Sequence, residues 1–117
     1  MAESAVLCAR AFVGAEATIG DNVLMNSGAS ADHECVISAD SHLAPGSVLA
    51  GRVHVGRGAF IGAGAVVREL LHIGEGALIA AGAVVVADVP AGATVMGVPG
   101  RARSESLSNW AAPEATA

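Results

Sequence analysis

The stretch VGRGAFIGAGAVV, residues 55–67, decides the fold of this 117-residue chain. Val55, Ile61 and Val67 stand six residues apart, and glycine and alanine fill most of the positions between them. An α-helix needs an apolar period near 3.6 and is weakened by glycine, so this pattern argues against one. A six-residue period of one aliphatic, one small residue and turn-forming residues is typical of a parallel β-helix.

The period extends far beyond this stretch. Stepping by six from Leu7 to Val85 meets Leu, Ile, Val or Met at thirteen of fourteen positions, and the exception is Ala31. The position four residues after each aliphatic is never bulkier than Val, except at Leu71. Each hexad predicts a short strand and a bend, and three hexads predict one triangular coil of about 18 residues with its aliphatics inside. Coils should stack at the ordinary strand spacing of about 4.8 Å.

We therefore expect an all-β chain with four to five coils between about Leu7 and Val89. Prolines and glycines after residue 89 are expected to end the regular winding. We divide the chain into a β-helix domain, residues 1–89, and a C-terminal cap with a polar tail, residues 90–117. The tail from residue 101 onward is expected to form a short helix or to be disordered.

Two outward columns of this register are apolar. Repeat proteins with open ends and apolar sides need caps or partners, so we expect a homotrimer. The columns consist of Leu24, Phe60 and Leu78, and of Val48, Val66 and Val84.

Composition excludes several classes of partner. The formal net charge is −5, whereas binding to nucleic acid phosphates needs a basic face. No apolar run approaches the ~20 residues of a membrane span. The first residues, MAES, lack the basic and apolar regions of a signal peptide, and two cysteines are too few for a disulfide scaffold. We expect a cytoplasmic protein.

The segment ADHECV, residues 31–36, concentrates the chemistry. His33 lies in a bend and is suited to general base catalysis because imidazole titrates near neutral pH. Asp32 and Glu34 are both candidates for the carboxylate that orients it. A loop of solvated charges is the alternative reading. Cys35 occupies a small inward position and is interpreted as core filler, not as a nucleophile.

Two further residues are placed by the length of one coil. Gly51 follows His33 by three hexads and should lie directly above it, where its N–H can stabilise an oxyanion. His42 follows His33 by one and a half hexads, half a coil, so the two histidines should lie on opposite sides of the prism. They can serve one site only if that site lies between two subunits. A structural interface role is the alternative for His42.

His54 and His72 are also three hexads apart and should stack. Stacked histidines raise the possibility of a metal site, as in hexapeptide-repeat carbonic anhydrases with zinc on three histidines. The same column otherwise holds Thr18, Val36 and Pro90. We therefore expect no metal.

The stretch NSGASADHECVISADSHLAPGSVLAGRVHVGRGAFIGAGAVV and the ending VPAGATVMGVPGRAR resemble one branch of the left-handed β-helix acyltransferases. That branch contains bacterial sialic-acid O-acetyltransferases and the sugar N-acetyltransferases of bacillosamine synthesis. The resemblance covers about residues 13–103, and DHEC followed by SHLAPG is its most specific part. It implies a left-handed coil, acetyl-CoA as acyl donor, and trimers that bind the donor between subunits.

The resemblance also implies site roles. His33 corresponds to the general base and Glu34 to its acidic partner, while His42 corresponds to a residue at the acetyl end of the cofactor. Asn26 corresponds to an active-site asparagine, although a turn role is the alternative, and we place Asp32 with it on the acceptor side. The cofactor set is completed by Gly51, by Ala63 and Ala81 beside the pantetheine, and by Arg101, which is suited to phosphate.

The sequence departs from that branch in two places. Its members carry an N-terminal nucleotide-sugar-binding domain of Rossmann-like type, which we expect this chain to lack. Glu69 and Leu70 also stand where the branch has a Pro-Gly bend. A left-handed Leu costs about 1–2 kcal/mol, so we expect that corner to be distorted.

The leading hypothesis is an acetyl-CoA-dependent acetyltransferase acting on an amine or hydroxyl of a sugar-like metabolite. The alternatives are a non-catalytic trimeric scaffold module and a metal-dependent, carbonic-anhydrase-like enzyme.

Overall fold

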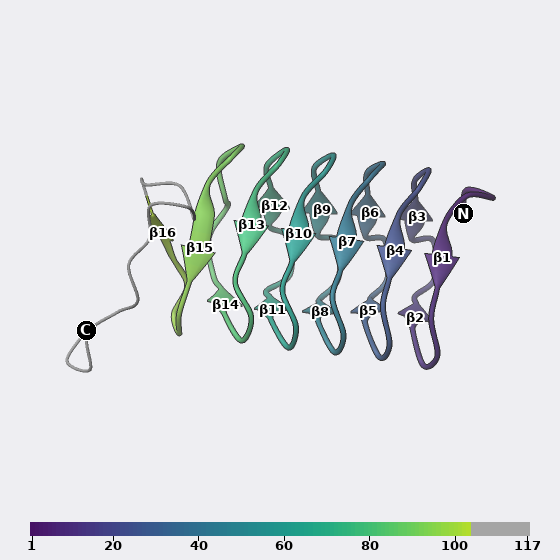
Figure 1. Cartoon of the computed structure of the whole chain (residues 1–117), viewed down its shortest axis with the longest axis horizontal. Helices are drawn as coiled ribbons and strands as arrows, with labels where there is room; N and C mark the ends of the chain where they lie inside the picture. Colours follow the sequence, from purple (N-terminus) through teal and green to yellow (C-terminus); the bar gives the residue numbers. More distant parts are fainter. Residues whose placement is uncertain (104–117) are drawn as a thin grey trace.

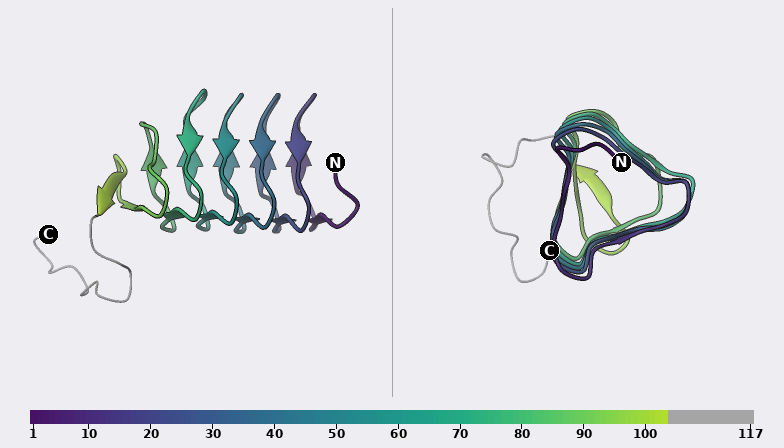
Figure 2. Two further views of the ribbon diagram at one scale, coloured as in Figure 1. Left: turned by 90° about the horizontal axis from the view of Figure 1, so that it is seen from above. Right: turned by 90° about the vertical axis from the view of Figure 1, so that its right-hand side faces the viewer.

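The computed structural model describes residues 1–103, which form sixteen short strands and no helix (Figure 1). No helix that could cross a membrane occurs among them. The strands form three sheets, which we call faces A, B and C, and all strand pairs except β15 with β16 are parallel. The end-on view shows the faces as the sides of a triangular prism (Figure 2). Face A contains β1 (Val6–Leu7), β4 (Leu24–Met25), β7 (His42–Leu43), β10 (Phe60–Ile61), β13 (Leu78–Ile79), β15 (Thr94–Met96) and β16 (Arg101–Arg103). Face B contains β2 (Phe12–Val13), β5 (Ser30–Ala31), β8 (Val48–Leu49), β11 (Val66–Val67) and β14 (Val84–Val85). Face C contains β3 (Thr18–Ile19), β6 (Val36–Ile37), β9 (His54–Val55) and β12 (His72–Ile73).

Successive coils pair in parallel with an offset of three hexads. Ile61 lies beside Leu43 on one side and Ile79 on the other, and the same offset holds through to the pairing of Val67 with Val85. The predicted register is therefore confirmed, and the chain is a left-handed parallel β-helix of hexapeptide repeats.

The core is the inside of the prism. The inward aliphatics from Ile19 to Val85 are buried, and Ala31, the weak position of the repeat, is buried completely as well. Leu7 was expected inside and is 37% exposed, because its coil is the first of the described coils and has no neighbour on that side.

The three corners differ in what occupies their left-handed bends. Corner A–B, between faces A and B, has glycine at four of its five positive-φ bends. Corner B–C has four positive-φ bends among the described residues, and each is occupied by a residue other than glycine. At corner A–B these residues are Arg10, Gly28, Gly46, Gly64 and Gly82, and at corner B–C they are Glu16, Glu34, Arg52 and Leu70. Corner B–C therefore presents a column of long side chains.

The last coil is shorter than the others. Leu78 pairs with Thr94, which follows it by two residues fewer than three hexads. Ile73 likewise pairs with Val89, although a strict count of hexads predicts a corner position for Val89. The Asp88 carboxylate accepts a hydrogen bond of 2.8 Å from the His72 N–H, which compensates for the missing backbone acceptor.

The C-terminal end of face A is closed by a reversal of the chain. β16 runs antiparallel to β15, with Met96 opposite Arg101 (Figure 1). Winding thus continues past residue 89, since β15 still stacks on β13. The division into residues 1–89 and 90–117 stays a prediction. The expectation of a short helix or disorder from residue 101 is wrong for residues 101–103, which form β16 because they pair with β15. For the rest of the tail this expectation lies outside the described residues.

Candidate active site

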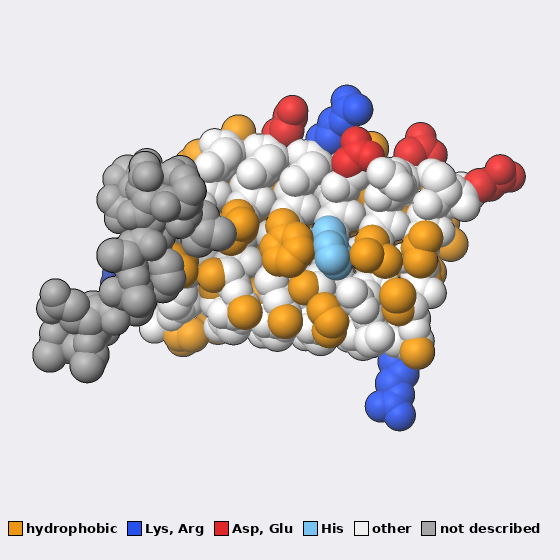
Figure 3. All heavy atoms as spheres, viewed as in Figure 1, with side chains coloured by type: hydrophobic (Ala, Val, Ile, Leu, Met, Phe, Trp, Pro, Cys, Tyr) orange, Lys and Arg blue, Asp and Glu red, His pale blue; other side chains and the backbone are white. Residues whose placement is uncertain are grey.

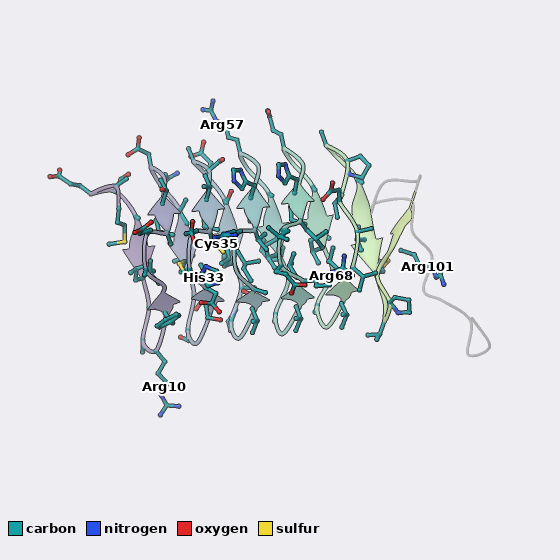
Figure 4. All side chains as sticks on the ribbon, turned by 180° about the vertical axis from the view of Figure 1, so that it is seen from behind. Arg10, His33, Cys35, Arg57, Arg68 and Arg101 are labelled. Carbon is teal, nitrogen blue, oxygen red and sulfur yellow. The ribbon has the colours of Figure 1, made fainter. Side chains whose placement is uncertain are left out.

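His33 lies in the bend of corner B–C, between β5 and β6. Its backbone N–H donates a 2.7 Å hydrogen bond to Asp32 Oδ1, which holds the start of the turn. Its side chain is 51% exposed and therefore accessible to a ligand. Figure 4 shows His33 on an edge of the prism away from Arg57.

Gly51 lies directly over His33, as the coil arithmetic predicted. The His33 carbonyl accepts a 2.9 Å hydrogen bond from the Arg52 N–H, which fixes the two coils in register. A Cβ built on Gly51 would fall 2.6 Å from His33 Cε1 and even nearer to Nε2, so a side chain at this position would push the imidazole out of its present orientation. Within residues 1–103 the Gly51 N–H has no hydrogen-bond acceptor.

Glu34, not Asp32, faces the imidazole ring. Its Oε1 lies 3.4 Å from His33 Nδ1, whereas Asp32 Oδ1 is engaged by the backbone. The same Oε1 accepts hydrogen bonds of 3.2 and 3.3 Å from Nη2 and Nε of Arg52. Arg52 first, and His33 second, hold the pKa of Glu34 below its ordinary value, so the carboxylate is ionised at neutral pH.

A hollow of about 320 Å³ opens beside His33. Its volume lies at the lower end of the range for small-molecule pockets. It is lined by His33, Ala50, Gly51, Arg52, Glu69 and Leu70. Sequence reasoning missed Arg52, Glu69 and Leu70 as lining residues, although stepping one and two coils on from positions 33 and 34 would have found all three.

The Glu69–Leu70 corner is not distorted, which corrects our expectation. Leu70 adopts the left-handed bend with φ 66°, and its N–H donates a 3.1 Å hydrogen bond to the Gly51 carbonyl. This bond repeats the one between Arg52 and His33 one coil earlier. The side chain is 64% exposed at the mouth of the hollow.

His42 lies on β7 in face A, opposite corner B–C, so His33 and His42 do not meet within one chain. Its ring packs edge-on against Phe60, with centroids 4.9 Å apart and an angle of 78°. Its Nε2 is buried and has no hydrogen-bond partner among the described residues. A buried polar atom of this kind costs free energy unless another molecule supplies a partner.

The other predicted residues lie elsewhere. Asn26, Ala63 and Ala81 lie at corner A–B, where the Ala63 carbonyl accepts a hydrogen bond from Gly82 and confirms the stacking of Ala63 and Ala81. Asn26 Oδ1 accepts a 2.8 Å hydrogen bond from the Ser27 N–H, which supports the turn role. Arg101 is exposed on β16 at the end of the prism. One chain therefore gathers only Asp32, His33, Glu34 and Gly51 from the predicted set.

Cys35 lies in the core, as predicted, and His54 and His72 stack on face C. Cys35 is buried, its Sγ donates to the Ala50 carbonyl at 3.1 Å, and burial raises the pKa of the thiol. His54 and His72 stack with centroids 4.8 Å apart and rings 8° from parallel. Within residues 1–103 no group of three potential metal ligands forms.

Comparison with known proteins agrees with this architecture. Residues 34–69 match the family described as bacterial transferase hexapeptide (six repeats). Residues 34–69 of this chain therefore carry the repeat that this family model describes. The matched repeats include Glu34, Gly51 and Arg52.

Solved structures of two acetyltransferases are similar along most of this chain. A His-to-Ala mutant of GDP-perosamine N-acetyltransferase from Caulobacter crescentus, in complex with CoA and GDP-perosamine, is 37% identical with a TM-score of 0.82. The acetyltransferase domain of PglB from Neisseria gonorrhoeae, in complex with acetyl coenzyme A, is 36% identical with a TM-score of 0.80. The similarity covers 89% and 87% of this chain, but 52% and 53% of those chains.

A curated relative is an acyltransferase. The acyl-[acyl-carrier-protein]–UDP-N-acetylglucosamine O-acyltransferase of Pseudomonas putida is 40% identical over 90 residues, which are 77% of this chain and 35% of the relative. The hexapeptide-repeat chain thus spans about half the length of the two acetyltransferase structures and about a third of this relative.

Proposed function

We propose that this protein is an acyltransferase that moves the acetyl group of acetyl-CoA to an amine or hydroxyl of a sugar or sugar-like metabolite. The observation that carries the proposal is the placement of His33 between the Glu34 carboxylate and Gly51, at the edge of a hollow. The printed descriptions of two similar structures, one with CoA and a nucleotide sugar and one with acetyl-CoA, support the choice of donor and acceptor.

In this proposal His33 acts as the general base. Glu34 accepts from Nδ1–H and so favours the tautomer whose Nε2 carries a free lone pair. Nε2 takes the proton of the attacking amine or hydroxyl as the new bond to the acetyl carbon forms. It then gives a proton to the sulfur as the thioester bond breaks, so the base is regenerated.

Gly51 supplies the second function. Its N–H, free of other partners within the described residues, can donate to the carbonyl oxygen as negative charge develops there. Asp32 shapes the turn that presents His33, and we place it with Asn26 on the acceptor side. The small residues Ala63 and Ala81 leave corner A–B open for the pantetheine arm.

We further propose that the site is completed in a homotrimer. His33 and His42 lie on opposite sides of one prism. In the trimer, the donor used by one subunit's His33 is therefore bound by His42 of the neighbouring subunit, with Arg101 of that neighbour near the phosphates. The unpartnered Nε2 of His42 in an apolar face supports this arrangement, because a ligand or a second subunit can satisfy it.

His33→Ala tests the proposal directly. Loss of a general base typically lowers rates by 10²–10⁴-fold, and we expect that loss in thiol release from acetyl-CoA with amino-sugar and sugar acceptors. Acetyl-CoA should still raise the melting temperature of His33→Ala, because binding to the native state stabilises it. His42→Ala should weaken that thermal shift instead.

His54→Ala is the matched control, because His54 is exposed on face C and does not line the hollow. It should behave like the unaltered protein in both assays. Full turnover by His33→Ala would disprove the mechanism. If acetyl-CoA gave no thermal shift with the unaltered protein, the scaffold alternative would be favoured.

A further inference from the structure

Three side chains of corner B–C meet at one oxygen atom. Glu34 Oε1 lies 3.4 Å from His33 Nδ1, and Nη2 and Nε of Arg52 donate to this same atom at 3.2 and 3.3 Å. Arg52 follows Glu34 by three hexads and therefore lies one coil above it. The β-helix thus joins a cation to the His33–Glu34 pair through the stacking of its coils.

We propose that Arg52 is a positioning residue that holds the Glu34 carboxylate against His33. This inference rests on the proposed function, because it assigns a role in the use of His33 as a base. Arg52 acts through Glu34 in this scheme, and contact with the substrate is not required.

Glu34 needs such an anchor because of its location. Its backbone is left-handed with φ 58°, and its side chain is 42% exposed, so unrestrained rotamers would turn the carboxylate into solvent. The planar guanidinium donates two N–H groups in a fixed fork, which orients a carboxylate better than a flexible ammonium does.

The other charged groups near His33 do not duplicate this role. Asp32 is occupied by the His33 backbone N–H, and Glu16 occupies the preceding bend of the same column. On the far side of the hollow, Glu69 lies 3.9 Å from its neighbour Arg68. Among the ion pairs of the described residues, only the pair with Arg52 links a cation to Glu34.

The first test does not depend on activity. In Arg52→Ala the pKa of Glu34, measured by carboxyl ¹³C NMR, should rise toward its ordinary value because the cation that lowers it is gone. Arg57→Ala is the matched control, because Arg57 forms an exposed pair with Asp40 at 3.5 Å, on a different edge of the prism (Figure 4). This control should leave the Glu34 titration unchanged.

The second test separates positioning from a structural or ligand-binding role. Arg52→Ala should lower kcat about 5-fold with KM for acetyl-CoA and acceptor unchanged, and Arg52→Lys should recover part of the loss. Its melting temperature should stay near that of the unaltered protein, since exposed ion pairs add little stability. In a Glu34→Gln background, Arg52→Ala should cause no further loss.

Several outcomes would overturn the inference. Losses that multiply in the double variant, or a higher KM at unchanged kcat, would mean that Arg52 contacts a ligand directly. If the unaltered protein is active but the pKa of Glu34 is unchanged in Arg52→Ala, the inference about Arg52 is wrong and the proposed function is unaffected. Absence of turnover in the unaltered protein would instead disprove the proposed function and, with it, the role of Arg52 in catalysis.

Discussion

Leu70 is an apolar, β-carbon-bearing residue in a backbone conformation that glycine usually occupies. It adopts φ 66°, a region that side chains with a Cβ seldom occupy, and exposes 64% of an apolar side chain. The neighbouring coils impose this conformation, because the Leu70 N–H must reach the Gly51 carbonyl for the stack to continue. Such strain is often kept where a residue serves a binding site, and Leu70 lines the hollow beside His33.

We predict that Leu70→Gly stabilises the protein by about 1 kcal/mol, because glycine occupies left-handed backbone without the Cβ penalty. Denaturant unfolding at fixed protein concentration measures the change. Leu70→Ala is the matched control, since it removes the exposed side chain but keeps Cβ, and it should give no comparable gain. Equal gains from both variants would assign the effect to the apolar side chain and contradict the backbone explanation.

At the scale of the element, most strands are only two residues long and have no stability of their own. Each inner strand is held by parallel pairing with the coils on either side and by an inward apolar side chain. Ile61 on β10 is completely buried between Leu43 and Ile79. Since every repeat contacts mainly its neighbours, a defect in one inward column should weaken both adjoining interfaces.

Ile61→Ala should therefore lower the free energy of unfolding by about 2–5 kcal/mol, and Ile61→Val by about 0.5–1.5 kcal/mol, because each leaves a cavity of graded size. Chemical denaturation with circular dichroism gives both values. His54→Ala, on the exposed face of the preceding strand, should change stability by less than about 0.5 kcal/mol. A cost for Ile61→Ala no larger than for His54→Ala would contradict the inward assignment.

At the scale of the whole molecule, the three faces differ in polarity. Face A presents a column of apolar side chains that is interrupted by a histidine. In Figure 3 the apolar side chains are orange and the histidine between them is pale blue. Face B is apolar at most outward positions, with Phe12 54% exposed and Val48 and Val66 each 38% exposed. Face C instead carries Thr18, His54 and His72. Two apolar faces on one prism are suited to a closed ring of identical subunits.

We predict a homotrimer by light scattering, with a site shared between subunits. Mixing His33→Ala with His42→Ala subunits should restore partial activity, because a mixed trimer can bring an intact His33 against an intact His42. His33→Ala mixed with His33→Ala/His42→Ala is the matched control and should remain inactive. Mixed trimers without recovered activity would contradict the shared site, and a monomer at micromolar concentration would contradict the trimer.

The repeat, the inward column and the stacking of Gly51 on His33 were predictable from the residues alone. These features follow from a period, because in a solenoid each residue lies against the residue one coil away and sequence distance translates directly into position. The handedness was different: a step of six residues is the same in either hand, so the left-handed coil came from the resemblance to a known family.

Features that do not repeat from coil to coil became visible only in the folded chain. The fold places the Glu34 carboxylate, and not that of Asp32, against the imidazole, because the Asp32 oxygen accepts from the backbone, and it brings Arg52 to the same Glu34 oxygen. It also kept the bend at Leu70 regular and shortened the last coil, where Asp88 supplies the missing acceptor. The physical reason is that rotamers and local hydrogen bonds depend on what the adjoining coils present at that point, which a periodic pattern does not encode.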